Sequence, residues 1–173
     1  CDALALIGDR EAIPKLHQAM DLRHRRVRTE AAASLARLGG AAGQEELLKL
    51  ASEPVARLRV LAYAEELGIV DQLEPEYRTA QARAEAELCV WLAEPMHFGI
   101  PPAECELVDH REQHWPGYED VVECFLFRFT YRLTTATVPA INSSNGISGP
   151  LVRAVAADLA ELPVDYIYAL YAG

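Results

Sequence analysis

Apolar residues recur at helical spacing through the first half of the chain, in three similar phrases that each end in glycine. The clearest phrase is Ala-Ala-Ala-Ser-Leu-Ala-Arg-Leu-Gly at residues 31–39, and weaker versions stand at residues 3–8 and 61–68. The closing glycines are about 30 residues apart, a period typical of stacked helical units. The first half is therefore predicted to be an array of antiparallel helix pairs.

The apolar stripes predict where these helices lie. One helix is expected over residues 12–20, and a pair follows over residues 26–38 and 44–52. Pro54 is a helix-starting residue and opens a third unit. After Gly68 the repeat pattern is lost, and a longer helix is predicted from Pro75 to Glu94. We expect this helix to cap the apolar end of the stack, which would otherwise face water.

The run Val-Arg-x-Glu-Ala-Ala-x-x-Leu-x-x-Leu-Gly at residues 27–39 resembles the bacterial HEAT-like repeat, also called the phycobilisome-lyase-type repeat. Residues 8–16 (Gly-Asp-x-x-Ala-Ile-Pro-x-Leu) are similar to the second helix of that repeat. The resemblance covers roughly residues 1–73. It departs from the family pattern at Arg59, where an acidic residue is expected. It implies an α-solenoid that binds proteins, and the repeat motif carries no catalytic residue.

From Pro95 the pattern changes from helical to alternating. Phe125, Phe127, Phe129 and Tyr131 alternate with other residues over 121–133, which predicts a strand. A second strand over residues 104–110 is expected to pair with it as an antiparallel hairpin. The aromatic face is expected to pack against the C-terminal helices.

The rest of the second half is predicted as loop and helix. Residues 134–149 are expected to be a loop with a turn at 142–146, with room for a short third strand at 138–142 or 146–148. Pro150 is expected to open a helix to Leu162, and Pro163 to open the last helix. The predicted fold class is mostly α: a short α-solenoid of HEAT-like helical pairs (residues 1–94) followed by a small α+β module with an antiparallel hairpin (residues 95–173).

Charge and composition exclude several functions. The net charge of −10 argues against nucleic-acid binding, which needs a basic face. The apolar runs are too short to cross a membrane, and the start lacks the features of a signal peptide, so a cytoplasmic protein with reduced thiols is expected. The chain begins midway through a repeat and without Met, so we expect further repeats upstream. No cofactor is expected.

Basic and aromatic residues are the candidates for binding a protein partner. Arginine side chains suit carboxylate and phosphate groups on a partner, and exposed tyrosines are frequent anchors at interfaces. The competing interpretation is that Arg26 and Arg28 form ordinary surface pairs with Glu30 or Glu53. The candidate partner-binding residues are Arg23, Arg25, Arg26, Arg28, Tyr166 and Tyr168.

A second candidate site is the segment that contains His110, Glu112, His114 and Trp115. In an extended strand the first three side chains would point the same way, so they could bind a ligand or a metal, with His97 or Cys105 completing the site. A metal is not favoured, because a zinc site needs three or four convergent ligands. The alternative is a set of surface histidines beside a packed tryptophan.

Residues 146–150 are a generic candidate for an anion site, since glycines there precede the predicted helix start. The simpler interpretation is that Ser148 caps that helix. The sequence carries no catalytic motif, so the favoured function is a protein–protein interaction scaffold or adaptor. The alternative is a bilin-lyase-like or other maturation factor with a small-ligand site between the repeats and the C-terminal module.

Overall fold

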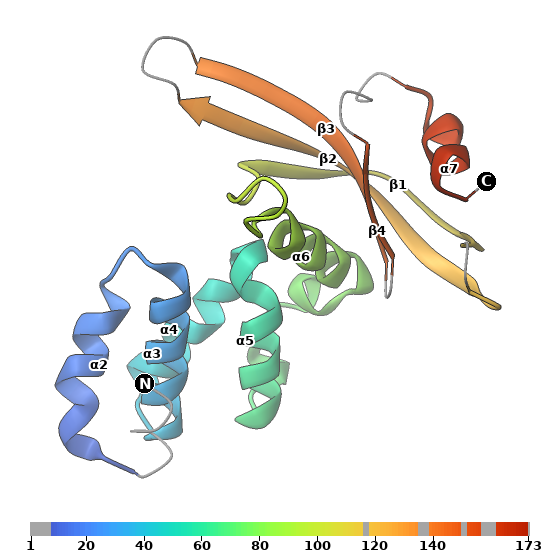
Figure 1. Cartoon of the computed structure of the whole chain (residues 1–173). Coiled ribbons are helices and arrows are strands. Elements are labelled where there is room, and N and C mark those ends of the chain that lie inside the picture. The colour runs from blue at the N-terminus through green and yellow to red at the C-terminus, as the bar shows by residue number, and fades with distance from the viewer. Residues whose placement is uncertain (1–7, 116–117, 135–138, 150–151, 157–161, 173) are drawn as a thin grey trace. The chain divides into compact units, whose positions relative to one another are not determined.

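The computed structural model describes residues 8–115, 118–134, 139–149, 152–156 and 162–172 (Figure 1). The chain divides into two compact units, Cys1–Arg83 and Ala84–Gly173. We call them the repeat unit and the sheet unit. The fold is mostly helical: HEAT-like helical pairs are followed by a small α+β module, as predicted. None of the described helices is both long and apolar enough to cross a lipid bilayer.

The repeat unit is built from short helices joined by tight turns. Glycines in the left-handed region end two of the repeats, Gly39 with a φ of 83° and Gly68 with a φ of 68°. The helices of this unit, in chain order, are η1 (Arg10–Ala12), α2 (Ile13–Met20), α3 (Arg25–Arg37), α4 (Ala41–Lys49), η2 (Leu50–Ser52), α5 (Pro54–Glu66), η3 (Val70–Gln72) and η4 (Pro75–Arg78).

Small side chains let these helices pack closely. Ala31, Ala32 and Ala33 on α3 are fully buried, and Leu35 beside them is 1 % exposed. The closest approach is at Gly43 on α4, where a Cβ atom would lie 2.4 Å from the Cβ of Leu35. The repeat phrase therefore supplies both the helix-forming residues and the small volume that the stack requires.

We expect Gly43→Ala to destabilise the repeat unit, although alanine is the better helix former. The added Cβ would also lie 2.7 Å from the carbonyl oxygen of Ala32, so α3 and α4 would be forced apart. Overpacking of this kind costs about 1–3 kcal/mol, against roughly 1 kcal/mol gained from helix propensity. Thermal unfolding followed by circular dichroism measures the balance.

The matched control for Gly43→Ala is Ala42→Gly, at the exposed neighbouring position of the same helix. This change loses only the helix propensity of alanine, about 1 kcal/mol. A Gly43→Ala protein that melts at or above the wild-type temperature would contradict the close packing of α3 against α4.

The sheet unit is a four-stranded antiparallel sheet with a helix on each face (Figure 1). Its strands follow one another in the order β1-β2-β3-β4, so each connection joins neighbouring strands. Helix α6 packs on one face and α7 on the other. The elements are α6 (Ala80–Leu92), β1 (Glu104–His114), β2 (Val121–Thr134), β3 (Pro139–Gly149), β4 (Val152–Ala156) and α7 (Val164–Ala172).

Side chains of β2 supply both layers of this core. The aromatic face was expected to pack on the C-terminal helices, but it packs on α6, where Leu88 and Leu92 are fully buried. The opposite face of β2 packs on Ile167 and Tyr168 of α7. The residues of the aromatic face are Phe125, Phe127, Phe129 and Tyr131.

The helix predicted from Pro75 to Glu94 as a cap for the stack is divided in the structure. Thr79 is extended, with a ψ of 157°, and its hydroxyl accepts a hydrogen bond from the Ala82 backbone N–H at 3.1 Å. Thr79 therefore caps a new helix, α6. Most of α6 packs on the sheet, so the compact units divide at Arg83, whereas the expected boundary follows residue 94.

Two predictions near the C-terminus are wrong. Residues 139–149, expected to be mostly loop, form the continuous strand β3, which pairs with β2 along its length. The helix expected from Pro150 is replaced by the strand β4, and residues 157–161 of that expected helix lie outside the described residues. Ser148 is consequently a buried strand residue and no helix cap, and the next described element after the generic anion-site candidate at residues 146–150 is the strand β4.

Candidate interaction surfaces

Polar side chains connect α3 with the equivalent helix of the next repeat, α5. Arg59 donates to Glu30 at 2.8 Å, and the hydroxyl of Tyr63 donates to the same carboxylate at 2.5 Å. Arg37 makes two hydrogen bonds to Glu66, at 2.8 and 2.6 Å. These contacts join residues that are one repeat apart, so this polar strip stabilises the stacking of repeats and its charges are already paired.

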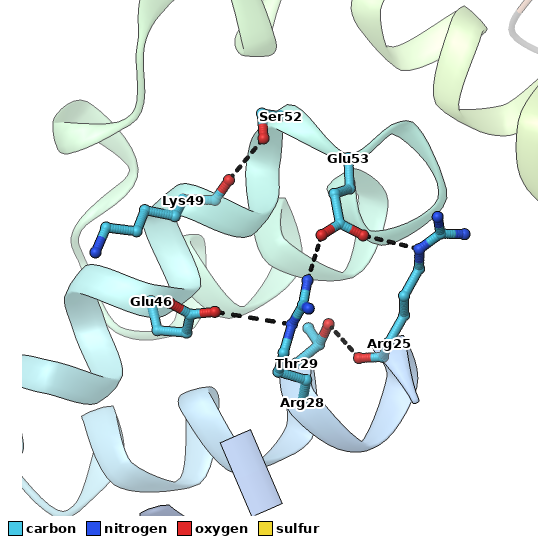
Figure 2. A network of polar contacts seen from close by, with 7 residues as sticks. All are labelled: Arg25, Arg28, Thr29, Glu46, Lys49, Ser52 and Glu53. Atoms are coloured by element: carbon cyan, nitrogen blue, oxygen red, sulfur yellow. Dashed lines mark hydrogen bonds and ion pairs between the residues drawn. The ribbon is translucent and has the colours of Figure 1, made fainter. Parts of the chain in front are cut away.

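A second polar network surrounds Glu53, at the start of α5 (Figure 2). Arg25 lies 2.9 Å from this carboxylate, and Arg28 contacts it as well. Arg28 also lies 3.7 Å from Glu46 of α4. The interpretation of Arg28 as a partner of Glu53 is confirmed. For Arg26 no pair with Glu30 or Glu53 is found among the described residues, and Glu30 pairs instead with Arg59 and Tyr63.

Two of the four candidate arginines, Arg25 and Arg28, belong to the network in Figure 2. Arg25 and Arg28 contact Glu53, although Arg25 is exposed, and Arg23 and Arg26 are exposed as well. In the part of the chain that the structure describes, neither Arg23 nor Arg26 forms an ion pair. Within the described residues, this second pair therefore lacks the carboxylate partner that the first pair has.

The hydrophobic neighbour of this pair is Leu22, which is 51 % exposed in the connection between α2 and α3. His24 lies between the arginines and caps α3, since its Nδ1 accepts a hydrogen bond from the Val27 backbone N–H at 3.4 Å. A helix cap of this kind fixes the direction of the chain as it enters α3. The exposed arginines are therefore held on a defined turn.

The histidine segment lies on β1, extended as predicted. The side chain of His110 stacks on the ring of Phe125, with ring centroids 4.4 Å apart, and its Nε2 lies 3.0 Å from Glu123. Glu112 and His114 are exposed. His110, Glu112 and His114 pair with Phe125, Glu123 and Val121 of β2 and so alternate on one face of β1.

The fourth residue of this candidate site lies elsewhere. Trp115 packs with Cys124 and Ile167 on the α7 face, which does not carry the histidines. His97 stacks on Trp91, with ring centroids 3.9 Å apart, and Cys105 packs beside the aromatic face. Among the described residues no group of three His, Cys, Asp or Glu side chains is placed to hold a metal ion.

The sequence analysis missed a charged cluster that fixes α7 to β1. Arg111 donates to Asp109 at 2.7 Å and to Asp165 of α7 at 3.0 Å, and its guanidinium lies 4.0 Å from the ring centroid of Tyr168. Burial acts to lower the pKa of Arg111, but the hydrogen bonds with Asp165 and Asp109 outweigh it and raise the pKa. The cluster therefore stays charged and fastens the helix.

Tyr168 cannot serve as the exposed partner anchor that the sequence suggested. It is 3 % exposed, its hydroxyl lies 3.5 Å from the Cys124 carbonyl oxygen, and burial raises the pKa of the phenol. Tyr166, by contrast, is 53 % exposed and remains a candidate partner-binding residue. A local sequence pattern could not separate the two, because the deciding contacts come from strands more than 40 residues away in the chain.

Comparison with known proteins identifies the first unit only. The family model of HEAT repeats matches residues 1–68, and this segment is a HEAT-like repeat segment. Neither the curated proteins nor the solved structures contain a significant match to the chain. The match supports the HEAT-like part of the resemblance and does not extend to its phycobilisome-lyase subtype.

Proposed function

We propose that the chain is a protein-binding module, in which the HEAT-like stack presents a surface to a protein partner. The observation that carries this proposal is the repeat segment itself. HEAT repeats commonly serve as protein-interaction scaffolds, and this segment matches their family model. Extended surfaces built from stacked helices suit protein partners.

The arrangement of charges in the repeat unit supports the same proposal. Glu30 and Glu66 are occupied by contacts between repeats. Arg23 and Arg26 are exposed and form no ion pair within the described residues. Contacts within the stack and contacts with a partner would then use different side chains, so binding would not require the stack to open.

Site-specific photo-cross-linking tests the proposal. A photoreactive amino acid replaces Gln18 or Lys49, which are exposed on α2 and α4, and the full chain is irradiated in an extract of its native host. We expect a discrete protein adduct from these positions. The matched control places the same amino acid at Tyr118, an exposed position of the sheet unit. Adducts from Tyr118 without any from the stack would overturn the proposal.

The bilin-lyase-like alternative has less support. It requires convergent polar groups around a small ligand, but His110, Glu112 and His114 alternate on one face of β1 and Trp115, which follows β1, packs on the α7 side of the sheet. The phycobilisome-lyase subtype of the repeats stays a proposal from the resemblance alone. We further propose a cytoplasmic location, where buried thiols such as Cys89 and Cys124 would stay reduced.

A further inference from the structure

Three exposed residues lie close together in the sequence where the α2–α3 connection enters α3, and we call them the basic corner: Leu22, Arg23 and Arg26. Leu22 is 51 % exposed and offers an apolar side chain beside the two arginines in the sequence. Asp21 is the acidic residue next to it in sequence, and it forms no ion pair with either arginine within the described part of the chain.

The charges at this corner conflict with the local rules of helix stability. The first turn of α3 contains no acidic residue, although the positive end of the helix dipole favours one there. Arg25, Arg26 and Arg28 occupy that region instead. Glu53 and Glu46 offset the charges of Arg25 and Arg28, but nothing described offsets that of Arg26. Departures from local consistency of this kind are typical of functional surfaces.

We propose that the basic corner binds an acidic segment of a protein partner, with carboxylates on Arg23 and Arg26 and an apolar side chain on Leu22. This proposal rests on the proposed function and adds the chemistry of the partner. Planar guanidinium groups bind carboxylates through paired hydrogen bonds, and an adjacent apolar contact excludes water from them.

Charge complementarity favours an acidic protein segment over a nucleic acid. The chain carries 26 acidic residues and 16 basic ones, so its overall field repels a long polyanion. A short acidic segment senses chiefly the charges within about 10 Å at moderate salt, and Arg23 and Arg26 form no ion pair within the described residues. The corner is therefore suited to a local carboxylate motif.

Fluorescence anisotropy with the full chain tests this inference. The probe is a labelled peptide in which one leucine is flanked on both sides by glutamates. We expect saturable binding that weakens as salt is raised. The double variant Arg23→Glu with Arg26→Glu should weaken binding by about tenfold or more, and Leu22→Ser by several-fold.

These variants separate binding from folding. Glutamate in the first turn of α3 is favourable for the helix dipole, so the double variant should melt at or above the wild-type temperature. The matched control, Arg10→Glu with Lys15→Glu, reverses two other exposed cations of the same unit and should change binding by no more than about twofold.

Several outcomes would overturn the inference. These are the absence of saturable binding, equal losses in the control and the corner variants, tighter binding of a single-stranded oligonucleotide than of the peptide, and self-association that disappears in the corner variant. Failure here is distinguishable from failure of the proposed function. If Gln18 still cross-links to a protein in the Arg23→Glu, Arg26→Glu background, the stack binds a partner through another surface.

Discussion

The variant Leu35→Asp is expected to unfold the repeat unit. Leu35 is 1 % exposed and lies in a cluster with Ala12 and Leu16, so an aspartate there would place an unpaired carboxylate in the apolar layer between helices. The cost is the lost apolar burial together with the desolvation of a charge, about 4 kcal/mol or more. That is a large part of the stability of a small domain, about 5–15 kcal/mol.

Circular dichroism during thermal unfolding measures the effect of Leu35→Asp. The control is Leu22→Asp, the same substitution at a leucine that is 51 % exposed, and its melting temperature should stay within a few degrees of wild type. If the two variants melted together, the assignment of the apolar stripe on α3 to the core would be incorrect.

The variant Phe127→Ala is expected to have a comparable effect on the sheet unit. Phe127 is 1 % exposed and packs in the cluster that joins the aromatic face of β2 to Leu88 and Leu92 of α6. Removing the ring leaves a cavity that a sheet and a helix cannot close without moving apart. Truncations of this kind cost about 3–5 kcal/mol.

Chemical denaturation followed by tryptophan fluorescence reports on the sheet unit, because both Trp91 and Trp115 pack in its clusters. The control is Tyr166→Ala, at an aromatic residue of α7 that is 53 % exposed, which should shift the midpoint much less. An equal shift in the two variants would mean that the aromatic face of β2 is no buried layer.

The helical half of the fold could be predicted because its signal is local and repeated. The phrase ending at Gly39 marks a helix, and its glycine has the left-handed conformation that the repeat ending requires. The alternation over Phe125–Tyr131 likewise marks a strand by itself. Both patterns arise from the regular spacing of buried residues within one short segment. A single sequence is therefore enough to identify them.

The C-terminal strands could not be predicted, because their residue types are typical of turns. Contacts with residues that are distant in the sequence place them in a sheet. The Asn-Ser-Ser-Asn-Gly segment is typical of a turn, but it lies within β3. A Cβ on Gly146 would lie 3.1 Å from the ring of Phe129 and 3.2 Å from Leu88. The glycine thus allows α6 to approach the sheet closely, a role that depends on residues far away in the sequence.

The polar contacts of the repeat unit were likewise predictable only in part. The Arg28–Glu53 pairing could be predicted from sequence, but the role of Arg59 could not. Arg59 departs from the repeat pattern, and in the structure it pairs with Glu30 of the preceding repeat at 2.8 Å. A reversal of charge between equivalent positions becomes interpretable only when the two helices are seen side by side.

The central claim is that the HEAT-like stack is the part of the chain that binds a protein. Hydrogen–deuterium exchange of the full chain, alone and with the partner identified by cross-linking, tests it most directly. Slower exchange on binding is predicted within residues 8–83, and most strongly at the connection between α2 and α3. Slower exchange confined to residues 84–173 would contradict the claim and assign binding to the sheet unit.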